Sequence, residues 1–366
     1  RLFVTDALQM TADKLPMGTD YVFPGDANGD RKADAADLLH LGLGYYATGA
    51  PRPFATSAWA PQFAPNWAES TASGVNFKHI DCDGNGVVND FDRNAIEQHY
   101  TPLDTNVLQS ANLSAPALWL KFAADTLVVD PNSPGPLTIS ADVMIGNPQE
   151  PVFDLYGLAF ALRYPEYVNH NPEVFYSTNS FFGAPNDILL LPKDNYARRQ
   201  FDMGFSRKFG QTVSGYGSIA KINFSTDFII IIDVIDRSES TVVPFVVPVQ
   251  ALQAIDAKGN KIELRGAVQD TVWLNVLEST DTRQRLLERR TLVYPNPTAL
   301  GEFWISTNSL AMETVEVFDA LGRLVEQHQP ASDFRTRLST QAWPKGLYTL
   351  RIQTDKGTLS KRLLVN

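Results

Sequence analysis

The sequence predicts a mainly β protein, in which a small α-helical module precedes two antiparallel β-sandwiches. Three observations lead to this fold class. An Asp- and Asn-rich loop occurs twice within residues 22–100, and each copy runs into a short helical pattern. Apolar segments separated by Pro, Asn and Gly fill residues 117–277, and no helix of crossover length separates them. A similar pattern with shorter spacing returns in residues 292–366.

Bulk composition limits the classes of protein that fit. The chain has 366 residues, of which 44% are hydrophobic, so two or three domains with real cores are expected. Its formal net charge of -10 argues against a nucleic-acid partner, because binding phosphates requires clustered Lys and Arg. The single cysteine excludes an intrachain disulfide. A chain with one cysteine is expected either in a reducing compartment or at the cell surface, where metal and β-structure would stabilise it.

Changes in composition suggest domain boundaries. The segment 1–21 resembles the end of an upstream domain, so we expect a mature form or a C-terminal fragment of a longer protein. The remaining predicted parts are a loop-and-helix module at 22–100 with an insertion at 44–78, a linker at 101–116, a sandwich at 117–277, a linker at 278–291 and a C-terminal domain at 292–366.

The duplicated loop has the ligand spacing of a twelve-residue calcium loop. Each copy places oxygen-bearing side chains at positions 1, 3, 5, 9 and 12, and position 7 offers a backbone carbonyl. Calcium prefers six to eight hard oxygen ligands, so two bound Ca²⁺ ions are expected. The candidate metal ligands are Asp26, Asn28, Asp30, Lys32, Asp34 and Asp37 in the first loop, and Asp81, Asp83, Asn85, Val87, Asn89 and Asp92 in the second.

The two loops differ at position 6, where the chain turns sharply. The second loop has Gly86 there, whereas the first has Arg31, which must adopt a strained backbone or another geometry. We therefore expect the first site to bind calcium more weakly. Helices are predicted to follow at Ala35–Leu41 and Phe91–Tyr100, with the last acidic ligand in the first turn, where it complements the helix dipole.

These loops resemble dockerin modules, which carry two F-hand calcium loops with Asp at position 12, each followed by one helix. The resemblance covers about Pro24–Tyr100. The insertion at 44–78 departs from the family, because it is much longer than the usual spacer between the repeats. Its aromatic residues either form a glycan or protein contact patch or pack onto the helices. They are Tyr45, Tyr46, Trp59 and Trp67.

The middle region resembles a cohesin-type sandwich through Leu155–Pro165 and Gly217–Phe224, although similar strands occur in carbohydrate-binding sandwiches. If it is cohesin-like, the resemblance implies recognition through a sheet face. The dockerin-like and cohesin-like modules then either pack together within one chain or link chains head to tail. A linker of roughly 15 residues reaches about 20 Å, which favours the internal arrangement. Strands are predicted at Leu118–Ala123, Leu137–Ile145, Leu155–Arg163, Gln200–Ser206, Ser218–Phe224, Phe228–Val234, Val246–Ala254 and Thr271–Val276.

The last 75 residues carry four phrases in an order that resembles the type A C-terminal sorting domain of type IX secretion substrates. They are Val293–Pro297, Val315–Val325, Trp343–Ile352 and Gly357–Val365. The resemblance implies export from a Gram-negative cell through the type IX outer-membrane translocon. It also implies handling by the sortase machinery, often with removal of the domain and anchoring to surface lipopolysaccharide.

No catalytic pattern emerges from the sequence. The five histidines show no metal-ligand spacing, and no nucleophile elbow, phosphate loop or dinucleotide fingerprint occurs. Cys82 lies at a loop position that points away from the metal, so a structural role is expected. Two hypotheses follow. The chain is a non-catalytic, calcium-stabilised module of a secreted cell-surface protein that acts in protein interaction or surface structure. Alternatively, it is the accessory carbohydrate-binding tail of a larger secreted enzyme or adhesin.

Overall fold

The computed structural model describes residues 21–106, 112–130, 136–168, 171–226, 231, 242–266, 270–276, 284, 287–288, 290–298, 301–307, 310–330 and 334–366. The chain divides into two compact units. The first comprises Arg1–Leu127, Pro136–Thr226 and Pro244–Trp273, and the second comprises Val128–Gly135, Asp227–Val243 and Leu274–Asn366. The predicted segment before Tyr21 lies outside the described residues, as does the strand predicted at Phe228–Val234 apart from Ile231. None of the described helices has the length and apolar content needed to span a membrane.

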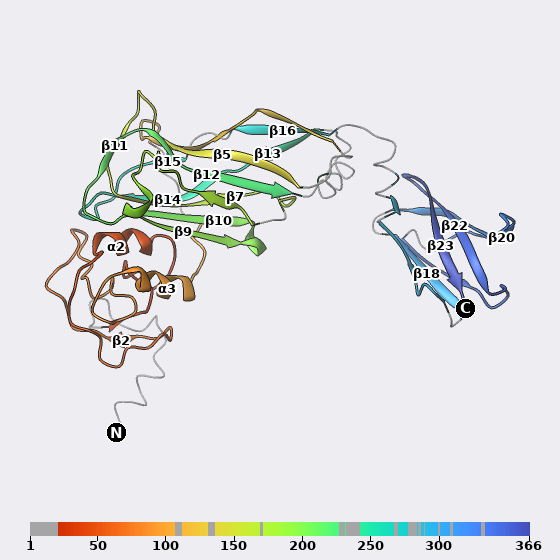
Figure 1. The fold of residues 1–366 in the computed structure, drawn as a ribbon, viewed down its shortest axis with the longest axis horizontal. Coiled ribbons are helices and arrows are strands. Elements are labelled where there is room, and N and C mark those ends of the chain that lie inside the picture. The colour runs from red at the N-terminus through yellow and green to blue at the C-terminus, as the bar shows by residue number, and fades with distance from the viewer. Residues whose placement is uncertain are drawn as a thin grey trace, which may run out of the picture. The chain divides into compact units, whose positions relative to one another are not determined.

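Two sheets form the large sandwich of the first unit (Figure 1). One sheet has the order β14-β7-β10-β9, with β7 at Gly157–Arg163, β9 at Ile188–Asn195, β10 at Gln200–Arg207 and β14 at Val249–Ile255. The other has the order β15-β3-β5-β12-β8, with β3 at Ala117–Phe122, β5 at Leu137–Ile145, β8 at Glu173–Phe175, β12 at Gly217–Thr226 and β15 at Arg265–Gly266. The pairings are antiparallel except that of β15 with β3.

Smaller elements complete this part of the chain. A three-stranded sheet has the order β13-β16-β4, a ribbon joins β11 to β6, and β1 pairs with β2 of the insertion. Their bounds are β1 Tyr21–Val22, β2 Gln62–Phe63, β4 Thr126–Val129, β6 Val152–Leu155, β11 Val213–Gly215, β13 Val242–Val246 and β16 Thr271–Val276. Two 3₁₀ turns flank β9, η2 at Pro185–Asp187 and η3 at Tyr196–Arg198.

Aromatic side chains fill the space between the sheets. Phe160 of β7 stacks on Phe205 of β10, with ring centroids 6.2 Å apart. Phe245 of β13 meets Phe122 and Phe224 edge-on, at 5.7 Å and 5.4 Å. All except Phe122 are fully buried, so the apolar phases of the predicted strands point inward and drive association of the sheets.

The strands β7 and β10 are buried on both faces, which is unusual for an antiparallel sandwich. One face carries large apolar residues toward the opposite sheet. The other carries small or polar residues, and helices α2 (Asp37–Leu43) and α3 (Asp90–Gln98) lie beside it (Figure 1). The loop-and-helix module and the sandwich, predicted as separate domains, therefore form one compact unit.

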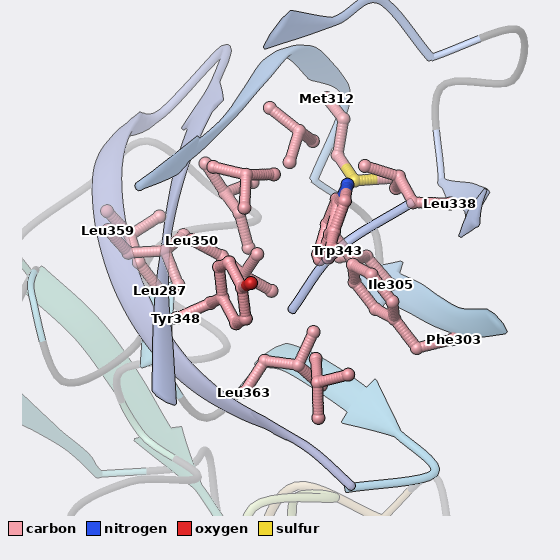
Figure 2. Close-up of a cluster of buried hydrophobic side chains, with 14 of the residues drawn as sticks. Leu287, Phe303, Ile305, Met312, Leu338, Trp343, Tyr348, Leu350, Leu359 and Leu363 are labelled. Atoms are coloured by element: carbon pink, nitrogen blue, oxygen red, sulfur yellow. The ribbon is translucent and has the colours of Figure 1, made fainter. Parts of the chain in front are cut away.

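The C-terminal domain is a second, smaller sandwich with the sheets β17-β18-β21 and β20-β19-β22-β23. Alternating side chains of its strands, together with Trp343 and Leu287, form one buried cluster (Figure 2). The mainly β fold with two sandwiches is thus confirmed. The strands are β17 Thr291–Tyr294, β18 Glu302–Thr307, β19 Met312–Phe318, β20 Leu324–His328, β21 Arg335–Ser339, β22 Gly346–Thr354 and β23 Gly357–Val365.

Candidate metal centre and its contact with the sheet

The position-12 carboxylates, Asp37 and Asp92, close the two loops in the same way. The Asp37 carboxylate accepts hydrogen bonds from the amides of Asn28 at 3.0 Å and Asp34 at 2.8 Å. The equivalent bonds of the second loop run to Asp92 from the amides of Asp83 at 3.0 Å and Asn89 at 2.7 Å. Both carboxylates are fully buried. The two loops therefore share one pattern of closing hydrogen bonds.

Asx-type turns wind the rest of each loop. In the first loop, Asn28 Oδ1 accepts from the Asp30 amide at 2.9 Å, and Asp30 Oδ1 accepts from the Lys32 amide at 2.9 Å. In the second loop, the amides of Asn85 and Val87 donate to Asp83 Oδ1 and Asn85 Oδ1 at 2.9 Å and 2.7 Å. Asp34 and Asn89 accept from the amides of Ala36 and Phe91, both at 2.8 Å, and Asn89 thereby caps α3.

Position 6 distinguishes the loops, as the sequence suggested. Arg31 adopts φ 68° and Gly86 adopts φ 89°, so a non-glycine residue occupies the left-handed region in the first loop. That conformation costs an ordinary residue roughly 1–2 kcal/mol. The amides of Arg31 and Gly86 donate to Oδ2 of the position-1 residues, Asp26 and Asp81, at 3.0 Å and 3.1 Å.

Oxygen donors gather where a cation would bind. The carboxylates of Asp81, Asp83 and Asp92 offer oxygen atoms that all lie within 4.8 Å of one another. In the first loop, Asp26 Oδ1 is buried and has no hydrogen-bond partner in the described part of the chain. Burial raises the pKa of Asp26 and of Asp92 to about 7, because no neighbouring group fully compensates their charge. These donors fit a hard cation such as Ca²⁺. The ligand set itself stays a prediction.

The position-2 side chains lie on the opposite side of the loops, in an apolar core. Ala27 and Cys82 are fully buried there with Leu38, Ile80 and Ile96. Burial raises the pKa of the Cys82 thiol well above its usual value, which disfavours the thiolate.

The aromatic residues of the insertion divide between the two predicted roles. Trp67 packs into the same core, and its Nε1 donates to the Ala50 carbonyl at 3.1 Å. Tyr45 is partly buried against it. Trp59 is 37% exposed and contacts Phe23 and His99, whereas Tyr46 is 64% exposed. A contact patch that includes Trp67 is thus incompatible with the fold.

Glycines allow α2 to lie directly on the sheet. A Cβ atom at Gly204 of β10 would lie 2.9 Å from the Ala35 carbonyl oxygen, and one at Gly42 of α2 would lie 2.1 Å from Ser206 Oγ. Around them, Leu39 packs against Ala159 and Ala161 of β7. Such close approach needs small residues on both surfaces.

Polar side chains of the sheet bond to the helices. Tyr156 Oη donates to the Gly42 carbonyl at 2.8 Å, and Ser206 Oγ donates to the Leu39 carbonyl at 3.2 Å. These bonds hold α2 against the sheet, and the Gly42 carbonyl is one of the last four of α2, which have no partner within the helix. This role was not predicted from the sequence, although polar residues on an otherwise apolar strand are a usable signal.

Asp202 of β10 anchors the chain where it leaves α3. Its Oδ2 accepts from Tyr100 Oη and from the Leu103 amide, both at 2.9 Å, and its Oδ1 accepts from Gln200 Nε2 at 2.8 Å. Burial raises the pKa of Asp202, and these three donors oppose that rise. The start of the predicted linker is therefore fixed to the sheet.

Comparison with known proteins gives one family match and several structural likenesses. Residues 292–366 match the family described as the secretion system C-terminal sorting domain, which confirms the predicted resemblance. A chain of a cohesin–dockerin complex from Clostridium thermocellum matches with TM-score 0.34 and 13% identity, covering 46% of this chain and 99% of that chain. A cohesin module of a family 33 glycoside hydrolase from Clostridium perfringens matches with TM-score 0.30 and 13% identity, covering 45% and 98%. A type II cohesin module from Acetivibrio cellulolyticus matches with TM-score 0.31 and 10% identity, covering 43% and 97%. No curated protein matches the chain.

Proposed function

We propose that the chain is a non-catalytic, calcium-stabilised module of a secreted cell-surface protein, exported through residues 292–366. One observation carries the proposal. Helix α2, which follows the first Asp-rich loop, lies on the outer face of the sheet β14-β7-β10-β9, and Glu97 of α3, which follows the second loop, binds Lys193 of β9, so the loops brace the sandwich. The sorting domain supports export by the type IX translocon and handling by its sortase machinery. Cleavage and anchoring to surface lipopolysaccharide belong to this proposal.

Calcium would act by fixing the helices. Each loop ends on a carboxylate in the first turn of its helix, so an ion held by the loop sets the start of that helix. The unfolded chain does not preserve this ligand geometry. Calcium binding energy therefore adds to the stability of the folded unit.

The outer face of β7 and β10 also bears on whether the loop-and-helix module binds the sandwich of its own chain or that of another chain. In this chain helix α2 covers the face of β7 and β10, which supports internal packing over head-to-tail chaining. A tethered contact benefits from a local concentration of roughly millimolar, which another chain in solution would have to exceed. A different surface protein would have to bind elsewhere on the unit.

The proposal predicts that removing calcium destabilises the folded chain. We expect isothermal titration of chelator-stripped protein to show one or two calcium sites. A hundredfold excess of free calcium over its Kd should stabilise the native state by about 2.7 kcal/mol in thermal unfolding. Asp37→Asn and Asp92→Asn should each abolish one site. Asp90→Asn is the matched control, because Asp90 is exposed in the first turn of α3 and is not a predicted ligand. Absence of both heat and thermal shift in the wild-type chain would contradict the proposal.

A carbohydrate-binding role is the second candidate, and one surface feature favours it. A cavity of about 180 Å³ is lined by Asp187, Arg207, Lys208, Phe209 and Gln211. The exposed ring of Tyr46 lies 6.1 Å from that of Phe209. Exposed aromatic rings beside polar groups suit sugar stacking. Glycan-array binding that is lost in Phe209→Ala would support this role, and silence of the wild-type chain would remove it.

A further inference from the structure

Arg52 of the insertion is a buried cation beside the second loop. It is 5% exposed, and its Nη2 donates to the Cys82 carbonyl at 2.6 Å. Its Nε and Nη1 have no hydrogen-bond partner among the described residues. Burial lowers the pKa of the guanidinium, and the carboxylates of Asp81, Asp83 and Asp92 act in the opposite direction. An arginine remains charged under these conditions, so its positive charge lies close to the carboxylates of this loop.

The backbone of the insertion holds Arg52 in place. The Arg52 amide donates to the Gly84 carbonyl at 2.9 Å, and the Gly49 amide donates to the Gly86 carbonyl at 3.0 Å. The amides of Tyr46 and Val88 extend the same contact, because they donate to the carbonyls of Val88 and Ala47 at 2.9 Å and 3.0 Å. The insertion thus follows the second loop along its length. It carries Arg52 as a fixed part of the fold and not as a mobile surface charge.

Position 4 of the two loops provides an internal comparison. A Cβ atom at Gly84 would lie 2.3 Å from Arg52 Nε, so the guanidinium rests directly on this residue of the second loop. The equivalent residue of the first loop, Gly29, faces His79 instead, with a Cβ–Cε1 distance of 3.7 Å.

The side chain that faces position 4 therefore differs between the loops: it is an arginine at the second loop and a histidine at the first. The first loop's own basic side chains, Arg31 and Lys32, are half-exposed and exposed, so water and salt screen their charges. The two loops share one hydrogen-bond pattern but differ in electrostatic surroundings. That difference has a consequence for metal binding, because a divalent ion in the second loop must be accommodated next to an existing positive charge.

We propose that Arg52 serves as the resident cation of the second loop. It holds that loop closed in the absence of calcium and weakens its calcium affinity, so the first loop is the tighter calcium site. This inference rests on the proposed function, since it assumes that the loops bind calcium. It reverses the order of affinities expected from Arg31 alone. The strain at Arg31 is already part of the fold, whereas the repulsion by Arg52 acts only when the ion binds.

The test compares Arg52→Met with wild-type protein in the full chain. Isothermal titration with calcium should show a gain of roughly a hundredfold or more at one site, as Coulomb's law gives for a unit charge ~10 Å from a divalent ion at an effective dielectric constant of about 20. Thermal unfolding in chelator should show a lower midpoint for the same variant. The two readouts move in opposite directions only if the charge itself matters. A merely structural role would weaken both stability and binding.

Two control variants separate charge from packing. Arg52→Lys keeps the charge and should leave the calcium affinities near their wild-type values. Lys78→Met removes another buried cation of the insertion, whose Nζ donates to the Ala64 carbonyl at 3.3 Å. It should lower the unfolding midpoint without raising affinity. Unchanged or weakened calcium binding in a folded Arg52→Met would overturn the inference.

A second measurement covers the case in which Arg52→Met does not fold. Asp92→Asn leaves the first loop to bind calcium, and Asp37→Asn leaves the second. The inference requires that the site remaining in Asp92→Asn be the tighter one, and the reverse order overturns it. If wild-type protein binds no calcium at all, the proposed function itself is wrong. That outcome is distinct from a calcium-binding chain with the opposite order of affinities.

Discussion

At the scale of single residues, the contact between α2 and the sheet depends on the absence of side chains. Gly42 faces Ser206 and the Arg207 carbonyl, and Gly204 faces the Ala35 carbonyl. These glycines are not required for backbone conformation, since neither adopts a left-handed φ. They are required because two backbones approach more closely than a Cβ atom allows.

Gly42→Ala should therefore destabilise the chain, although alanine is the better helix former. Helix propensity alone would stabilise this variant by about 1 kcal/mol. Overpacking against Ser206 should outweigh that gain and give a net loss of about 2 kcal/mol in denaturant unfolding. Gly74→Ala is the comparison, because its Cβ meets open space and only the φ of +90° is strained. It should lose about 1 kcal/mol. A stabilised Gly42→Ala would show that the close contact is absent in solution.

At the scale of elements, strands with a clear apolar phase could be predicted from the sequence, and those shaped by tertiary contacts could not. The predicted strands Leu137–Ile145 and Thr271–Val276 coincide with β5 and β16. The predicted strand Leu155–Arg163 contains β7, and its first residue, Leu155, is the last residue of β6. Strand β9 was missed because Pro192 and the polar residues that follow it interrupt its apolar run.

The candidate site shows the same division. The loop spacing predicted that Asp37 and Asp92 lie in the first turn of their helices, as they do, because each loop is a local structure of twelve residues. The partners of that site could not be predicted, since they come from distant segments. Arg52 lies about 30 residues before the second loop, and Asp202 lies about 100 residues after α3. The only sequence signal for a covering element was the small and polar residues on the outer face of β10, the face on which α2 lies.

The bond between Tyr100 and Asp202 should contribute to holding α3 against β10. Tyr100→Phe removes one donor to a buried carboxylate while Leu103 and Gln200 continue to donate. We expect a loss of about 1.5–3 kcal/mol in denaturant unfolding, the range for hydrogen bonds to charged groups. Tyr46→Phe is the control, because Tyr46 is exposed. Equal stability of the two variants would argue that Asp202 is protonated or that α3 is not anchored there.

At the scale of the whole molecule, the C-terminal unit has a core of its own that begins before the sorting-domain match. Leu287 is buried in the cluster with Phe303, Tyr348 and Leu359, although the family match starts at residue 292 (Figure 2). The Thr291 hydroxyl donates to the Leu287 carbonyl at 2.9 Å, and Lys361 Nζ donates to the Glu288 carbonyl. The end of the predicted linker is thus part of this unit's fold.

Leu287→Ala should destabilise the C-terminal unit alone. Truncating a buried leucine to alanine typically costs about 2–5 kcal/mol, through lost burial and the cavity left behind. Scanning calorimetry of the full chain should show the loss in one transition, and that transition should not respond to chelator because the proposed calcium loops belong to the other unit. Leu321→Ala is the matched control, since Leu321 is 78% exposed, and it should change neither transition. If Leu287→Ala instead lowered the chelator-sensitive transition, the two units would unfold as one, and calcium bound at the loops would then stabilise the sorting domain as well.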